Sequence, residues 1–316
     1  MKNVKSTTLM ALAMTVFLGA CQKEETQNNE TIQQTPPMEI SKLGSKLMKA
    51  ANQSLSVSSA VSTGKKTVML YKAEYITSGK GGRAGNTVYF NNRGNKELNE
   101  GFVPGLNLDG SNNISYYVDR LRPSQSLSVS DTESAIVRAM RTWDNANCSN
   151  LGMTKINATN KPTGYISLIL GFGGSSNYVA DINHAGWMNR FFFDQLASNG
   201  GDFILGVTFT LIFTDGNGNP LDSDNNNKLD VAWREIYYND NFSWNNGSDY
   251  DVESIALHEA GHGLSQGHFG KAFLSGNGKL HFAPKAVMNA SYSGIQTTIG
   301  KTDLGGHCGI WGSWPK

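Results

Sequence analysis

The run His258-Glu259-Ala260-Gly261-His262 constrains the fold of this 316-residue chain more than any other sequence feature. Residues four apart on an α-helix lie on one face, with roughly 5–6 Å between their Cβ atoms. If this stretch is helical, His258 and His262 can therefore bind the same metal ion. Glu259 follows the first histidine, where its carboxylate reaches a metal-bound water and need not bind the metal itself.

A third histidine, His268, lies six residues beyond His262, which is too far along to share the face of a straight helix. If the helix ends near Gly263 and the chain turns back, His268 supplies a third nitrogen. Three protein ligands and a water in the fourth position form the coordination of a catalytic zinc ion. The other interpretation, a helix with structural histidines, fits the ordered set of three ligands and a base less well.

A predicted tight turn follows at Ala286-Val287-Met288-Asn289-Ala290-Ser291-Tyr292. The histidine motif and this turn resemble the metzincin zinc proteases. The resemblance is to their matrixin branch, where a tyrosine lies four residues after the methionine, as Tyr292 does after Met288. It runs from about residue 113 to the end of the chain. It implies an α+β fold with a twisted, mostly parallel sheet, an active-site helix, a Met-turn and a C-terminal helix.

The resemblance also implies a function, a zinc-dependent endopeptidase that hydrolyses peptide bonds of extracellular proteins. In that family the three histidines bind Zn²⁺, and the glutamate at the position of Glu259 is the general base. The methionine at the position of Met288 packs beneath the metal, and Tyr292 would shape the primed-side pocket. The implied partner is a protein or peptide substrate.

Two positions depart from the family pattern. Metzincins usually carry glycine at the third residue after the second histidine, where this chain has Ser265. Either Ser265 adopts the left-handed backbone conformation at a cost, or the turn shifts onto Gly263 or Gly267. Phe269 stands where matrixins usually carry serine or threonine.

Two other functions fit parts of the pattern. A zinc hydrolase of another clan would use a distant acidic third ligand and leave His268 structural. A catalytically weak or inactive surface lipoprotein would keep the zinc fold as a binding module, which the departures at Ser265 and Phe269 allow. The intact Glu259 favours the enzyme, because a binding module does not need the base.

The N-terminus predicts export. Lys2 and Lys5 precede an apolar run over residues 9–20. A basic start and a short apolar core are typical of a signal peptide, predicted over residues 1–20, and the run is too short to span a bilayer stably. Cys21 follows directly.

The sequence around this cysteine predicts a membrane anchor. Leu18-Gly19-Ala20-Cys21 resembles a bacterial lipobox, which implies that Cys21 is lipidated, although an ordinary signal peptide is the alternative. Gln22-Lys23-Glu24-Glu25 resembles a surface-export tag of some Bacteroidetes lipoproteins. We expect an outer-membrane lipoprotein at the cell surface, or released from it, and leave a periplasm-facing location open.

Composition and pattern divide the rest of the chain. Residues 21–38 are rich in Gln, Asn, Glu and Thr and predict a disordered tether. Residues 39–105 predict a pro-segment or accessory module, with strands over 68–71 and 88–90. Residues 106–316 predict a metzincin-like catalytic domain.

Within the predicted catalytic domain, apolar patterns indicate the elements. Ser130 and Glu133 predict the start of a helix that extends to about Trp143, and Asp251 is the predicted N-cap of the histidine helix. Residues 172–203 predict an insertion that packs its own aromatic side chains, with His184 structural. The predicted strands cover residues 114–118, 153–156, 165–170, 207–213 and 233–238, the last with an edge open to an extended peptide.

A polar loop precedes the last of these strands. It resembles the first nine places of a calcium-binding loop, with candidate ligands Asp222, Asp224, Asn226 and Asp230. Trp233 stands where a bidentate glutamate belongs. A polar turn without an ion is the alternative.

The two remaining cysteines and the net charge support further predictions. Outside the cytoplasm, Cys148 and Cys308 form either a disulfide or two free buried thiols. The net charge of +1, with 17% charged residues, gives no argument for nucleic-acid binding. We expect a monomer.

Overall fold

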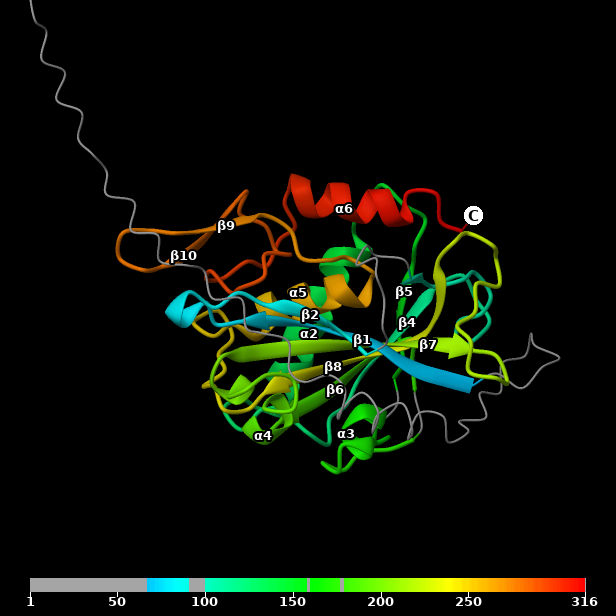
Figure 1. The fold of residues 1–316 in the computed structure, drawn as a ribbon, viewed down its shortest axis with the longest axis horizontal. Helices are drawn as coiled ribbons and strands as arrows, with labels where there is room; N and C mark the ends of the chain where they lie inside the picture. Colours follow the sequence, from blue (N-terminus) through cyan, green and yellow to red (C-terminus); the bar gives the residue numbers. More distant parts are fainter. Residues whose placement is uncertain (1–66, 91–99, 158–159, 177–178, 316) are drawn as a thin grey trace, which may run out of the picture. The chain divides into compact units, whose positions relative to one another are not determined.

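The computed structural model describes residues 67–90, 100–157, 160–176 and 179–315 (Figure 1). The predicted signal peptide, the predicted lipidation site Cys21 and the predicted tether lie outside these residues. Within the described ranges, no helix combines the length and the apolar character needed to cross a bilayer. The architecture is α+β, with helices around a mixed central sheet, so the coarse fold class is confirmed.

The central sheet has the strand order β2-β1-β7-β8-β6-β4-β5, with β3 paired to β8 outside this path. Its strands are β1 (Thr67–Thr77), β2 (Asn86–Tyr89), β3 (Glu100–Gly101), β4 (Ile114–Val118), β5 (Met153–Lys155), β6 (Ile182–Met188), β7 (Ile204–Thr214) and β8 (Leu229–Asn239). Strands β4, β5, β6 and β8 are parallel, whereas β7 runs antiparallel to both β8 and β1. The sheet is therefore mixed, with parallel pairings among β3, β4, β5, β6 and β8 and antiparallel pairings among β1, β2, β7 and β8.

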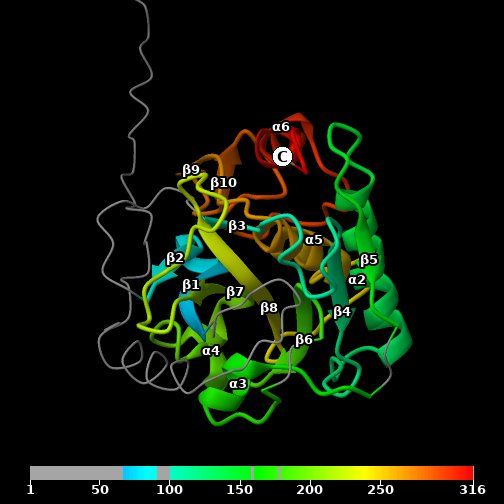
Figure 2. The same cartoon turned by 90° about the vertical axis from the view of Figure 1, so that its right-hand side faces the viewer.

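Helices cover both faces of this sheet (Figure 2). Helices α2 (Val129–Asp144) and α5 (Val252–Gly263) lie on one face, and the short helices α3 (Tyr165–Ile169) and α4 (Arg190–Phe193) lie on the other. Strand β8 shows how the two cores arise. Its side chains alternate, so Ile236 and Tyr238 enter the α2–α5 core while Trp233 and Tyr237 enter the α3–α4 core.

The chain after α5 forms a separate layer over it. A hairpin of β9 (Lys271–Leu274) and β10 (Leu280–Ala283) comes first, and the C-terminal helix α6 (Lys301–Trp311) closes the layer. Short 3₁₀ turns occur at Lys80–Gly82 and Gly200–Asp202. The predicted C-terminal helix is thus present.

The prediction of a strand over residues 165–170 was wrong, because this segment is helix α3. The buried carboxylate of Glu235, on β8, accepts hydrogen bonds from the backbone N–H groups of Tyr165 at 2.8 Å and Ile166 at 2.9 Å. These are N–H groups that a helix start leaves without intrahelical partners. A contact with the distant strand β8 therefore stabilises a helix here, although the local sequence pattern favours a strand.

Residues 172–203, predicted as an insertion, contribute a strand to the central sheet, while Phe172, Phe192 and Phe193 pack on one another as predicted. Strand β6 lies inside the sheet between β8 and β4. Its polar side chains are buried with partners: Asn183 accepts from the amides of Val179 and Ala180, and Nδ1 of His184 lies 2.8 Å from the hydroxyl of Tyr238. His184 is thus a buried structural residue, as predicted.

Strand β8 has no open edge for an extended peptide, contrary to prediction. It pairs with β7 on one side and β6 on the other over most of its length.

The predicted start of helix α2 was also wrong by two residues. Ser128, not Ser130, is the N-cap, and its hydroxyl accepts a hydrogen bond from the amide of Asp131 at 3.1 Å.

The predicted boundary after residue 105 does not separate two structural units. Strand β1 pairs with β7 along its length, from Thr67 opposite Thr214 to Thr77 opposite Ile204, and nearly all its residues are buried. Over its described part, the predicted pro-segment or accessory module contributes strands β1, β2 and β3 to the central sheet, with β1 in its interior. The short apolar run at 68–71 did not reveal its distant partner β7, whereas the run at 88–90 pairs with the nearby β1.

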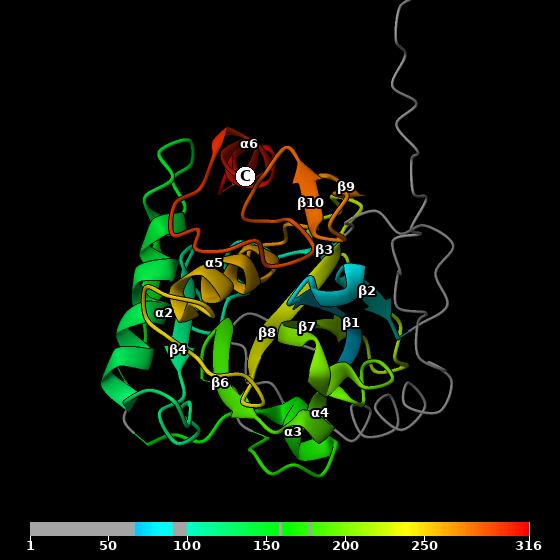
Figure 3. The same cartoon turned by 90° about the vertical axis from the view of Figure 1, so that its left-hand side faces the viewer.

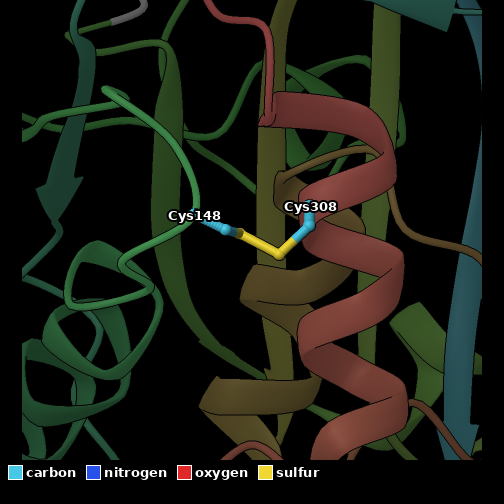
Figure 4. Close-up of a disulfide and its surroundings, with 2 residues drawn as sticks. All are labelled: Cys148 and Cys308. Atoms are coloured by element: carbon cyan, nitrogen blue, oxygen red, sulfur yellow. A yellow bond between two sulfur atoms is a disulfide. The ribbon is translucent and has the colours of Figure 1, made fainter.

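Cys148 and Cys308 form a disulfide with an S–S distance of 1.99 Å (Figure 4). The bond joins the loop after α2 to helix α6, across 160 residues of sequence. The structure therefore contains the cross-link, and not the alternative of two free thiols.

Candidate metal centre

Helix α5 carries the histidine motif and is buried along almost its whole length. Its N-cap is Asp251, as predicted, whose carboxylate accepts from the amide of Ser254 at 2.8 Å. A Cβ atom at Gly261 would lie 2.3 Å from Sδ of Met288 and 3.1 Å from a ring atom of Trp143. The glycine inside the motif thus lets α5 pack closely on the methionine turn and on α2.

Three imidazoles converge at this helix. Nε2 of His268 lies 3.3 Å from Nε2 of His258 and 3.2 Å from Nε2 of His262. Nδ1 of His258 donates to the carbonyl oxygen of Val287 at 2.7 Å, and Nδ1 of His262 donates to that of Gln266 at 2.7 Å. Because a carbonyl only accepts, these Nδ1 atoms carry the protons. Both Nε2 atoms therefore present lone pairs when the rings are neutral.

The environment favours neutral rings. Burial lowers the pKa of His258 to about 4, and burial together with the neighbouring histidines holds the pKa of His262 and His268 well below the usual range. Converging lone pairs repel one another unless a cation lies among them. A tetrahedral zinc with Zn–N bonds of 2.0–2.1 Å would place its nitrogens about 3.3 Å apart, close to the distances found. This triad can hold a metal ion.

The turn after α5 brings His268 back to the other two histidines. Ser265 adopts the left-handed conformation with φ 66°, so the turn has not shifted to a neighbouring glycine. Its hydroxyl accepts a hydrogen bond at 2.9 Å from Nη2 of Arg234, and Nη1 of the same guanidinium donates to the carbonyl of Gly263 at 2.6 Å. Arg234 belongs to β8 and is fully buried. One side chain therefore fixes both the end of α5 and the residue that turns the chain.

The charge of Arg234 is balanced by the N-terminal strands. Its guanidinium lies 3.7 Å from the carboxylate of Glu100 on β3, and Lys72 on β1 lies 2.6 Å from Glu100 and 2.7 Å from Glu74. Glu74 lies 3.6 Å from Nδ1 of His262. A buried network of charged side chains thus extends from β1 and β3 to the turn that carries His268, and none of these side chains was predicted from the sequence.

Glu259 is buried against β7. Its carboxylate accepts a hydrogen bond from the hydroxyl of Thr208 at 2.6 Å. A Cβ atom at Gly206 would lie only 3.0 Å from Glu259, so the glycine leaves room for this side chain. Burial raises the pKa of Glu259 well above its usual range, partly offset by the Thr208 hydroxyl and the backbone amide of Ile76.

The methionine turn is held in place by α6. Asp303 accepts hydrogen bonds from the backbone amides of Val287 and Met288, each at 3.1 Å, and from that of Gly300 at 3.0 Å. Asp303 lies three residues after Gly300, the N-cap of α6, and this spacing is typical of a helix start. No local sequence pattern indicated that Asp303 also contacts the methionine turn. Tyr292 is partly buried near the start of α5, where its hydroxyl accepts from the amide of Asp251 at 3.3 Å.

The candidate calcium ligands lie together in the loop between β7 and β8. Carboxylate oxygens of Asp222, Asp224 and Asp230 lie within 4.8 Å of one another. The loop also satisfies these groups itself: Asn226 donates to Asp222 and Asp224, at 3.0 and 2.8 Å, and the amide of Ser223 donates to Asp230. These contacts equally suit a polar turn, so calcium binding stays a prediction.

No protein-family model matches this chain, and a search of curated proteins finds no similar sequence.

Proposed function

We propose that this chain is a zinc-dependent endopeptidase of the metzincin type. The observation that carries the proposal is the convergence of three neutral imidazoles, from His258, His262 and His268, at distances that suit zinc. Glu259 follows the first ligand, and Met288 packs against the helix beneath the site. The α+β sheet, the buried helix and the C-terminal helix are compatible with the metzincin fold.

The metal ion and the protein side chains would contribute different parts of the hydrolysis reaction. Zinc, when bound, would lower the pKa of a water ligand toward about 7 and polarise a peptide carbonyl. Glu259 would accept the proton of the attacking water and pass it to the leaving amine nitrogen. The hydroxyl of Thr208 would orient its carboxylate. The carbonyls of Val287 and Gln266 would keep two imidazoles in the orientation that presents Nε2.

We also propose export and lipid attachment at Cys21, with an outer-membrane location and a protein or peptide substrate. The support is the apolar N-terminal run and the lipobox-like sequence. Mass spectrometry of the mature protein tests this proposal. We expect an acylated Cys21 at the N-terminus, and an unmodified chain that starts elsewhere would contradict it.

Zinc content and casein cleavage test the enzyme together. The full-length protein, purified in mild detergent, should contain about one zinc ion per chain, as should Glu259→Ala. We expect cleavage by wild type and by the matched control Glu253→Ala, which lies on the same helix away from the site, but not by Glu259→Ala. Zinc retention by His268→Ala would instead favour a hydrolase of another clan.

A further inference from the structure

A metal ion at the three histidines would bring positive charge into a largely buried site, and the inference drawn from this rests on the proposed function. His258 and His262 are buried. Neutral imidazoles add no charge that balances Zn²⁺. A buried charge is costly unless an opposite charge lies near it. A carboxylate beside one of the ligand rings would therefore strengthen metal binding.

Glu74 places such a carboxylate beside the ring of His262. Its Oε2 atom lies 3.6 Å from Nδ1 of His262, and its side chain is 1% exposed. The hydroxyl of Thr87 donates to the other oxygen, Oε1, at 3.4 Å. Oε2 makes no hydrogen bond with any described residue, and it forms an ion pair with Lys72 at 2.7 Å. The negative charge at this oxygen therefore acts on both the ammonium group and the imidazole.

The alternation of side chains along β1 turns Glu74 toward the histidine helix. Ala73 and Tyr75 enter the α3–α4 core, whereas Ile76 enters the α2–α5 core. Successive side chains of a strand point to opposite faces, so Lys72 and Glu74 share the face of Ile76. Helix α5, in gold in Figure 3, packs on this face of the sheet. The two charged residues of β1 are thus buried on the side of the sheet that carries the metal ligands.

Lys72 reduces the negative charge that Glu74 presents to the histidine. The ammonium group of Lys72 is fully buried and lies 2.7 Å from Glu74 and 2.6 Å from Glu100. With Arg234 beside Glu100, these described side chains comprise as many cations as carboxylates. A bound dication would add positive charge to this balanced set. Coulomb attraction to Glu74 would favour the ion, and repulsion by Lys72 would oppose it.

We propose that Glu74 is a positioning residue that supplies negative charge to the metal centre through His262, and that Lys72 opposes this effect. The carboxylate stabilises the positive charge that the imidazole gains when its Nε2 atom binds the ion. Outer partners of a ligating histidine commonly raise metal affinity in this way. The carbonyl of Gln266 already accepts the Nδ1 proton at 2.7 Å, so Glu74 acts through its charge and not through that hydrogen bond.

The affinity for Zn²⁺ tests this role without relying on catalysis. The full-length protein in mild detergent is titrated against a chromophoric zinc chelator, and a urea transition verifies that each variant is folded. Glu74→Gln keeps the shape of the side chain and removes its charge, so zinc affinity should fall by about 10–100-fold. Lys72→Met removes the opposing cation, so zinc affinity should rise by about threefold or more.

The opposite directions distinguish an effect of charge from an effect of structure. Both variants break a buried ion pair and should destabilise the fold, so a purely structural role would lower zinc affinity in both. Lower affinity in Lys72→Met, or wild-type affinity in Glu74→Gln, would overturn the proposal. Arg234 does not suit this comparison, because its guanidinium also binds Ser265 and Gly263 at the turn.

A double variant provides the test if Glu74→Gln alone does not fold. Lys72→Met with Glu74→Gln removes the ion pair as a unit. Its zinc affinity should be about tenfold or more below that of Lys72→Met alone, and equal affinities would overturn the proposal. The matched control is Glu253→Gln, which removes a partly exposed carboxylate at the start of α5 and should leave zinc affinity unchanged.

Casein cleavage separates this inference from the proposed protease. Zinc affinities in the expected order, without casein cleavage by zinc-loaded wild type, would support the role of Glu74 and contradict the protease. Casein cleavage by wild type, with equal zinc affinity in wild type and Glu74→Gln, would contradict the role of Glu74 alone. A wild-type protein that binds no zinc would contradict both.

Discussion

Ser265 holds a left-handed backbone that glycine would adopt at lower cost, and Arg234 compensates for the difference. The guanidinium binds the hydroxyl of Ser265 and the carbonyl of Gly263, so a distant strand fixes the turn that delivers His268. Charged hydrogen bonds of this kind typically contribute about 1.5–3 kcal/mol. The strained serine at this turn thus has a physical counterpart in Arg234.

Replacing Arg234 tests this role. Arg234→Met removes the buried cation and leaves Glu100 with Lys72 alone, so we expect a loss of about 3–5 kcal/mol in the free energy of unfolding. Zinc affinity should fall by about 10–100-fold, because the turn that orients His262 and His268 loses its support. Denaturant titration and zinc competition measure the two effects.

The matched control for this variant is Arg138→Met, because Arg138 lies on the partly exposed surface of α2. It should leave zinc affinity unchanged. Ser265→Gly keeps the left-handed turn and should lower zinc affinity by less than about tenfold. Wild-type zinc affinity in folded Arg234→Met would show that Arg234 does not position the site.

His184 gives a prediction for acid stability. Burial lowers its pKa from 6.5 to about 3, so the folded state binds fewer protons than the unfolded state between these values. Stability contributed by the neutral ring is present above pH 6.5 and is lost as the pH falls toward 3, by about 1.4 kcal/mol per pH unit. We expect His184→Gln to show a shallower loss between pH 6 and 4 in urea titrations. The same slope as wild type would contradict this assignment.

Residue-level prediction succeeded where the chemistry is encoded by short spacing. His258, His262 and His268 were found from their offsets, because a helix and a turn fix where such side chains point. Thr208, Arg234 and Asp303 were missed. Each contacts the site from an element far away in sequence, and a single sequence does not reveal such pairings.

At the level of elements, the disulfide and Asp303 tie α6 to the rest of the site. The Cys148–Cys308 bond closes a loop of 160 residues, which restricts the unfolded chain. We expect Cys148→Ser with Cys308→Ser to lower the free energy of unfolding by about 2–4 kcal/mol. Urea titration with and without a reducing agent measures this: reduction should destabilise wild type only. Equal stability of wild type and the double variant would contradict a formed disulfide.

Elements with a regular local pattern were predicted well, and those set by distant contacts were not. Strand β4 was placed correctly, and β7 to within three residues, because apolar side chains dominate both. Helix α3 was missed because Glu235 holds its first amides, and β6 because its Asn183 and His184 are buried polar residues. Local periodicity carries no signal for either arrangement.

At the level of the whole domain, the N-terminal strands are part of the sheet. Without residues 1–105, β7 would lose its partner β1, and Arg234 would lose the carboxylate of Glu100. We therefore expect the fragment 106–316 to lack a cooperative urea transition, whereas the full-length chain should show one. A stably folded 106–316 fragment would support the pro-segment interpretation over ours.

We propose that this site hydrolyses peptide bonds with Glu259 as the general base. The most direct measurement is the rate of casein hydrolysis by the zinc-loaded full-length protein, for wild type and Glu259→Gln. General acid–base catalysis contributes about 10²–10⁴-fold, so we expect the variant to be slower by that factor at equal zinc content. Equal rates, or no hydrolysis by the zinc-loaded wild type, would contradict this mechanism.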